Sequence, residues 1–125
     1  MTKTPKPQRA VDASGIEVLD HMRRLEARAT PGLMAYVIPI FINDSVARLV
    51  LLREAVARQD LEGAHRLAHT LHGSAATVGA DSMVLACAEI IRHVGAGAFA
   101  RCEPIIQRLD TDLESIRRVS QATGI

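Results

Sequence analysis

The sequence predicts an all-α fold: an antiparallel up-and-down four-helix bundle with two additional N-terminal helices. Apolar residues recur at intervals of three and four along most of the chain, which is the period of an α-helix. No segment shows the alternation of apolar and polar residues that is typical of a half-buried strand. The expected connections are short, so consecutive helices should be antiparallel neighbours. A chain of 125 residues fits one domain of ordinary size.

The N-terminal segment, residues 1–15, is expected to be a flexible tail. It contains Pro5, Pro7 and three basic residues but few apolar ones, so it has little surface to bury. The remaining residues, 16–125, are expected to form the helical domain. Its first helix is predicted over residues 16–28, with an apolar face made of Val18, Leu19, Met22 and Leu25.

A very apolar stretch predicts the second helix. It is expected to open at Thr30-Pro31, because threonine can cap a helix and proline fits the first helical position. It should run to Ile42, but Pro39 should kink or break it, since proline removes a helical N–H and clashes with the preceding turn. A third helix is predicted from residue 44 or 45 to residue 58.

Three further helices complete the expected bundle, over residues 61–78, 80–94 and 98–119. Asp60 can cap the first of them, and Gly79 suits the left-handed position just past its end. Gly95 and Gly97 end the second. Pro104 marks a late start or a bend in the third.

The composition excludes several classes of partner. Lys and Arg number 15 against 14 Asp and Glu, so no strong field attracts nucleic acid or a membrane surface. No segment is expected to have the length of a transmembrane helix, and the N-terminus does not resemble a signal peptide. Cys87 and Cys102 fall at apolar helical positions and are expected to be core residues rather than a disulfide. We therefore expect a soluble, cytoplasmic monomer, with the apolar residues 33–42 packed on the bundle.

Three of the five histidines lie close together, at positions 65, 69 and 72. On a helical wheel His69 projects about 140° from the centre of the apolar stripe, so it should face water. Gly73 lies one turn later on the same side, where a glycine costs roughly 1 kcal/mol relative to alanine. Its missing side chain would leave room for a partner beside the imidazole. Imidazole has a reference pKa of about 6.5, so it is a competent nucleophile near neutral pH.

The segment A-H-T-L-H-G-S-A-A-T-V-G-A, residues 68–80, resembles the signature of histidine-containing phosphotransfer (HPt) domains of bacterial two-component phosphorelays. That signature has a histidine, a hydrophobic residue two later, Lys-Gly three and four later, and Gly-Ala ten and eleven later. The matching residues are His69, Leu71, Gly73, Gly79 and Ala80. The residues 41–44, the turn Gln59-Asp60 and Cys87 also resemble family features, and the resemblance extends over residues 16–119.

The resemblance implies that His69 accepts a phosphoryl group from an aspartyl phosphate on a receiver domain and passes it to another receiver aspartate. The implied partners are response-regulator receiver domains and a hybrid or sensor histidine kinase, with Mg²⁺ supplied on the receiver and no cofactor of its own. It implies a carrier protein without kinase activity. Residues expected to support the phosphoryl group or docking are His65, Arg66, His72, Gly73 and Ala76.

Two positions depart from the family pattern. His72 stands where the family usually has lysine, and Ile91 where it often has glutamate. Lysine is charged at pH 7, whereas histidine is mostly neutral there. We therefore expect a phosphohistidine that is less well stabilised or more sensitive to pH.

Alternative functions remain open at this point. His65, His69 and His72 have the spacing of helical metal ligands, and Glu62 is a candidate further ligand, although no residue of this helix clearly completes the site. A non-catalytic binding module of the same fold is a second alternative. A sensor kinase fits less well, because Thr70 replaces the acidic residue expected after its histidine and no ATP-binding segment is present. His21 and His93 are interpreted as ordinary surface or helix-end histidines.

Overall fold

The computed structural model describes residues 12–124 and contains five α-helices and one short 3-10 turn in that range. The helices are α1 (Ala13–Arg28), α2 (Leu33–Ala57), α3 (Leu61–Val78), α4 (Asp81–Gly95) and α5 (Cys102–Ala122), with the turn η1 (Phe99–Arg101) before α5. No strand occurs in the described range, and the predicted all-α class is confirmed.

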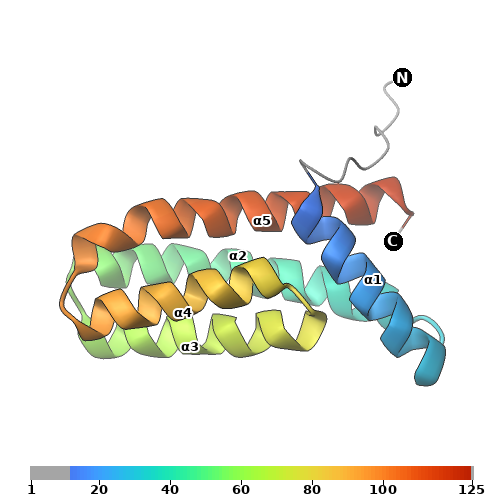
Figure 1. The fold of residues 1–125 in the computed structure, drawn as a ribbon, viewed down its shortest axis with the longest axis horizontal. Helices are drawn as coiled ribbons and strands as arrows, with labels where there is room; N and C mark the ends of the chain where they lie inside the picture. The colour runs from blue at the N-terminus through green and yellow to red at the C-terminus, as the bar shows by residue number, and fades with distance from the viewer. Residues whose placement is uncertain (1–11, 125) are drawn as a thin grey trace.

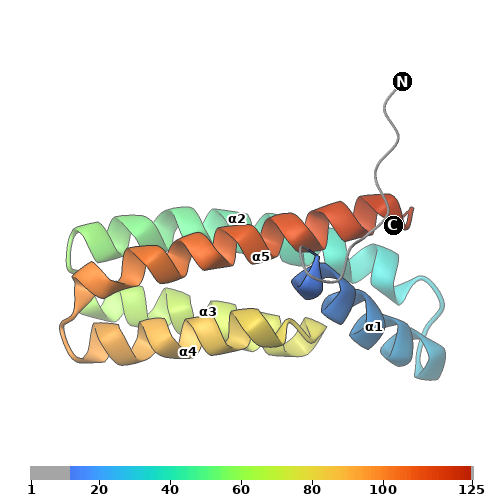
Figure 2. The ribbon, with the colours of Figure 1, turned by 45° about the horizontal axis from the view of Figure 1, so that its top comes forward.

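Helices α2, α3, α4 and α5 lie side by side, and consecutive ones run in alternate directions (Figures 1 and 2). Helix α1 crosses one end of this group and packs mainly on α5. One continuous core joins all five helices. Its largest fully buried side chains include Met22, Ile38, Leu52, Leu71, Met83, Ile90, Ile106, Leu109 and Ile116.

The predicted break at Pro39 is wrong, and the second and third predicted helices are one helix, α2. One additional N-terminal helix, α1, therefore flanks the bundle instead of two. Buried residues continue to recur every three or four positions across the expected boundary between the two helices, at Ile38, Phe41, Ser45 and Leu49. Proline loses one hydrogen bond of the helix. Packing of this continuous face against the core outweighs that local cost.

The expected start of this helix at Thr30-Pro31 is also wrong. Helix α2 begins at Leu33, after Gly32 in a left-handed conformation with φ of 85°. The Glu26 carboxylate of α1 accepts a hydrogen bond from the Met34 backbone amide at 2.8 Å. A side chain from the preceding helix thus satisfies a free N–H at this terminus.

Helix α2 is long and apolar enough to cross a membrane by length and composition alone. The expectation that no segment reaches that length is therefore wrong. A mostly buried core helix of a soluble protein passes the same test, whereas 28% of the apolar window of α2 is buried. Ile38, Leu49 and Leu52 of α2 are buried in the core shared with the other helices.

The N-terminal tail was predicted to extend to residue 15. Residues 1–11 lie outside the described part, while Ala13, Ser14 and Gly15 form the first turn of α1. A Cβ atom on Gly15 would lie 2.4 Å from the Ser115 carbonyl oxygen of α5. The missing side chain of Gly15 thus allows α1 and α5 to approach closely.

Several local predictions are confirmed. Asp60 caps α3, Gly79 ends it with φ of 75°, and Pro104 lies in the first turn of a helix that starts late, at Cys102. Cys87 and Cys102 are free, buried thiols. Burial raises the pKa of Cys87 to about 12, as expected for a core thiol.

Candidate functional site

Helix α3 has one buried face and one exposed face. The buried residues are Gly63, Ala64, Ala68, Leu71, Ala75 and Val78. His65, Arg66 and His69 are exposed, and His72 is half-buried. The structure therefore places His69 on the solvent side of the helix, as the helical wheel predicts.

The N-terminal end of α3 is fixed by its own cap. The Asp60 carboxylate accepts a hydrogen bond from the Gly63 backbone amide at 3.0 Å. A Cβ atom on residue 63 would lie 2.2 Å from Asp60 Oδ2, so this compact cap requires glycine. Asp60 could be predicted as the cap from the sequence, and the position of Gly63 three residues later was the available signal for its role.

The C-terminal end of α3 is held by α1. His21 Nε2 donates a hydrogen bond to the Thr77 carbonyl oxygen at 3.2 Å, which satisfies a free acceptor of the last turn. The His21 ring also covers Gly79, where a Cβ atom would lie 2.3 Å from His21 Cγ. The interpretation of His21 as an ordinary histidine is therefore wrong. His93, at the end of α4, makes no side-chain hydrogen bond within residues 12–124, and its prediction stands.

Glu17 of α1 lies beside the start of α4. Its carboxyl group is close to Asp81 and Ser82, and its Oε2 atom is buried without a hydrogen-bond partner among the described residues. Burial, and then the nearby Asp81 carboxylate, raises the pKa of Glu17 above its ordinary value. Sequence reasoning missed this residue. The N-cap of α4 is Ala80, which has no side chain to cap the helix, so nothing in the local sequence points to Glu17.

Open space lies beside His69. A Cβ atom added at Gly73, one turn later, would meet no other atom within 4 Å, and Ala76 beyond it is exposed. The hydroxyl groups of Thr70 and Thr77 donate back to main-chain carbonyls of α3 at 3.0 Å. Neither hydroxyl needs a partner, and the missing side chain at Gly73 leaves the imidazole open on the side toward the C-terminal end of α3.

The rings of His65 and His69 stack. Their centroids lie 6.1 Å apart with an angle of 18° between the ring planes. Stacking restricts the orientation of an otherwise exposed His69 side chain. Within residues 12–124, no group of three His, Cys, Asp or Glu side chains is arranged to hold a metal ion. The geometry gives no support to the metal site considered for His65, His69 and His72.

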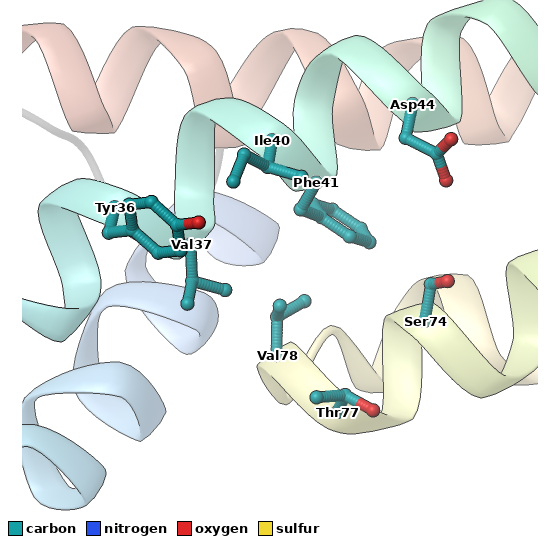
Figure 3. A pocket seen from close by; sticks show the side chains of 8 residues that line it. All are labelled: Tyr36, Val37, Ile40, Phe41, Asp44, Ser74, Thr77 and Val78. Carbon is teal, nitrogen blue, oxygen red and sulfur yellow. The ribbon is translucent and has the colours of Figure 1, made fainter.

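A groove runs between α2 and α3 beyond Gly73. It encloses about 330 Å³ and is lined by Tyr36, Val37, Ile40, Phe41, Asp44, Ser74, Thr77 and Val78 (Figure 3). The α2 wall is mainly apolar, and Tyr36 and Ile40 on it are 71% and 52% exposed. Apolar side chains this exposed near an open helix face indicate a surface for protein contact.

The comparisons with known proteins agree with this arrangement. A family model described as Hpt domain matches residues 37–119, which is more than half of the chain and includes all of α3 and α4. No curated protein matches the sequence, and no solved structure matches it either.

Proposed function

The chain belongs to the Hpt domain family, and on that premise we propose that His69 is its phosphoacceptor. Hpt domains carry phosphoryl groups on histidine in phosphorelays and interact with receiver domains and histidine kinases. The observation that supports His69 is its exposure beside the open position at Gly73, on a helix fixed at both ends. His65 and His72 lack that combination. His65 lies two turns from the open position at Gly73, and His72 is half-buried.

In the proposed reaction, an imidazole nitrogen of His69 attacks the phosphorus of an aspartyl phosphate on a receiver domain. The N–P bond forms as the bond between phosphorus and the carboxyl oxygen breaks, and the carboxylate leaves with the electron pair. The reverse step passes the group to a second receiver. The receiver contributes the aspartate, the Mg²⁺ and a lysine, so this chain contributes a positioned nucleophile and needs no cofactor.

The neighbouring side chains have supporting roles in this proposal. His65 orients the His69 ring by stacking on it. His72 donates one hydrogen bond to the phosphoryl group in place of the charge that lysine supplies in the family pattern, and Arg66 adds positive charge on the same exposed side. Gly73 and Ala76 admit the partner surface, and the groove beside them receives apolar side chains of the receiver.

The test is a transfer assay without ATP. The protein is incubated with Mg²⁺ and phosphorylated receiver domains from its own organism, and protein-bound phosphate that is labile to acid and stable to alkali is measured. The variants are His69→Gln and His72→Gln. We expect label on the wild type and on His72→Gln, and none on His69→Gln.

Two other outcomes are informative. Label that disappears only in His72→Gln would identify His72 as the acceptor. Binding of a receiver without any label would favour the non-catalytic binding module. The presence of His72 in place of the family lysine is the reason for testing this alternative.

A further inference from the structure

The C-terminal half of α1 carries a concentration of arginines that the rest of the fold does not neutralise. Arg23, Arg24 and Arg28 are exposed, and none forms an ion pair with a described carboxylate. On α2 and α5 the arginines within the helices are paired, as Arg48–Asp44, Arg53–Asp110, Arg108–Glu89, Arg117–Glu114 and Arg118–Asp12. Four other exposed arginines also form no ion pair with a described residue, but they are spread over four different segments: Arg58, Arg66, Arg92 and Arg101. Arg23, Arg24 and Arg28 differ from these because they are grouped within one half of α1.

The acidic residues of α1 do not cancel this charge. The Glu26 carboxylate is directed to the Met34 amide at the start of α2. Asp20 is exposed one turn before Arg24, yet the two form no ion pair. Guanidinium groups with no partner among residues 12–124 remain available to a carboxylate from outside.

Arg24 and Arg28 line a depression, which we call the α1 depression. It encloses about 180 Å³, and His21 and Leu25 line it too. Leu25 is 38% exposed and contributes apolar surface to the same depression. An aspartate or glutamate side chain fits this chemistry, because its methylene groups can contact Leu25 while its carboxylate accepts paired hydrogen bonds from arginine.

The α1 depression adjoins the groove beside the histidine helix. His21 lines the depression and donates its hydrogen bond to Thr77, and Thr77 lines the groove. The C-terminal end of α1 extends beyond the turn between α3 and α4 (Figures 1 and 2). From His69 to Thr77 the helix rises about 12 Å, and from His21 to Arg28 about 10 Å. A partner domain about 30 Å across, docked with its centre over the groove, therefore spans both His69 and the α1 arginines.

We propose that the α1 depression is the charged part of the docking surface and binds acidic side chains of the receiver domain. This inference rests on the proposed function, since it takes the receiver as the partner. Arg24 and Arg28 act at a distance from the reacting atoms and select and orient the partner. They raise the rate of association and leave the transfer step at His69 unchanged.

The experiment compares two double variants with the same change of charge. Arg24→Glu/Arg28→Glu reverses the charge of the α1 depression. Arg92→Glu/Arg101→Glu is the control, because both arginines are exposed, form no ion pair with a described residue, and lie at the opposite end of the bundle. Single-turnover transfer from a phosphorylated receiver is measured against receiver concentration, at low and at high ionic strength.

For the α1 variant we expect about a tenfold higher half-saturating receiver concentration at low salt, with the same maximal rate. The difference from wild type should shrink at high salt, since added ions screen exposed charges. The control should change less than twofold. Equal effects of the two variants, or a lower maximal rate in the α1 variant, would overturn the proposal.

Binding of the unphosphorylated receiver separates this proposal from the proposed function. If wild type takes no label but binds the receiver, the proposed function fails, and weaker binding by Arg24→Glu/Arg28→Glu alone would still support the α1 depression. Vesicles containing anionic lipid provide the competing partner. Loss of vesicle binding in the α1 variant, with receiver binding intact, would assign these arginines to a membrane surface and overturn the proposal.

Discussion

The ring of His21 in α1 lies directly on Gly79, at a place where a Cβ atom would be 2.3 Å from His21 Cγ. Gly79 also has a φ of 75°, a conformation that side chains with a Cβ rarely adopt. Two independent constraints thus exclude other residues at this position. They give a physical reason for a glycine ten residues after the proposed phosphoacceptor, in the turn that ends its helix.

Replacing Gly79 should therefore destabilise the protein strongly. For Gly79→Ala we expect a loss of roughly 2–5 kcal/mol in the free energy of unfolding, from backbone strain and overpacking together. Gly97→Ala is the matched control, because its φ is 73° but nothing lies within 4 Å of its Cβ position. That variant should lose only roughly 1–2 kcal/mol, from strain alone. Urea denaturation measures both, and equal losses would contradict the role of His21.

Substitution of Gly73 should separate stability from function. Gly73→Ala should raise the free energy of unfolding by up to about 1 kcal/mol, because the position is helical and open. Gly73→Leu should fold equally well but block close approach of the receiver, with at least about a tenfold lower transfer efficiency at low receiver concentration. Transfer by Gly73→Leu at the wild-type rate would show that the gap has no role.

Glu17 should contribute a pH dependence to stability. Its pKa is raised above 4.5 by burial and by Asp81, so the folded state holds its proton more tightly than the unfolded state does. Its stabilising contribution is complete below pH 4.5 and is lost as the pH rises through the folded-state pKa. Glu17→Gln cannot titrate. Relative to wild type, this variant should therefore become more stable between about pH 4 and about pH 7.

Parallel urea titrations of wild type and Glu17→Gln across that range measure the difference. A constant difference at every pH would mean that the Glu17 carboxyl group does not titrate differently on folding. Asp20→Asn is a suitable control, because Asp20 is an exposed carboxylate on the same helix.

The residue at position 72 should set the lifetime of the phosphorylated protein. A lysine there would place a full positive charge next to the phosphoryl group throughout the neutral pH range, whereas an imidazole can offer a hydrogen bond without a permanent charge. We expect His72→Lys to lengthen the half-life of phosphohistidine and to make it less dependent on pH between about pH 6 and about pH 8. Hydrolysis of the isolated phosphoprotein measures this, and superimposable decay curves would refute it.

Features with a local cause could be predicted from the sequence. The exposed face of α3, the cap at Asp60 and the left-handed Gly79 each depend on a few neighbouring residues, and all three are confirmed. The position of His69 on the solvent side follows from helical periodicity alone. Its role as phosphoacceptor is a proposal from the family and the open space at Gly73.

Features that depend on distant residues could not be predicted in this way. Pro39 signals a break locally, and only the packing of the whole α2 face shows that the helix continues. The contacts of Glu17 with Asp81 and of His21 with Thr77 join residues more than fifty positions apart. No periodicity or cap signal in a single sequence contains such pairings.

The proposed acceptor, His69, is the ninth of the 18 residues of α3, so it occupies the midpoint of a helix with both ends tied down. Helices fray from their ends, and the middle turns open last. The backbone that carries the proposed nucleophile is thus ordered before a partner binds, so docking costs little conformational entropy of the backbone at this position. Amide hydrogens around residue 69 should accordingly exchange more slowly than those at either end of the helix, although the side chain itself is open to solvent.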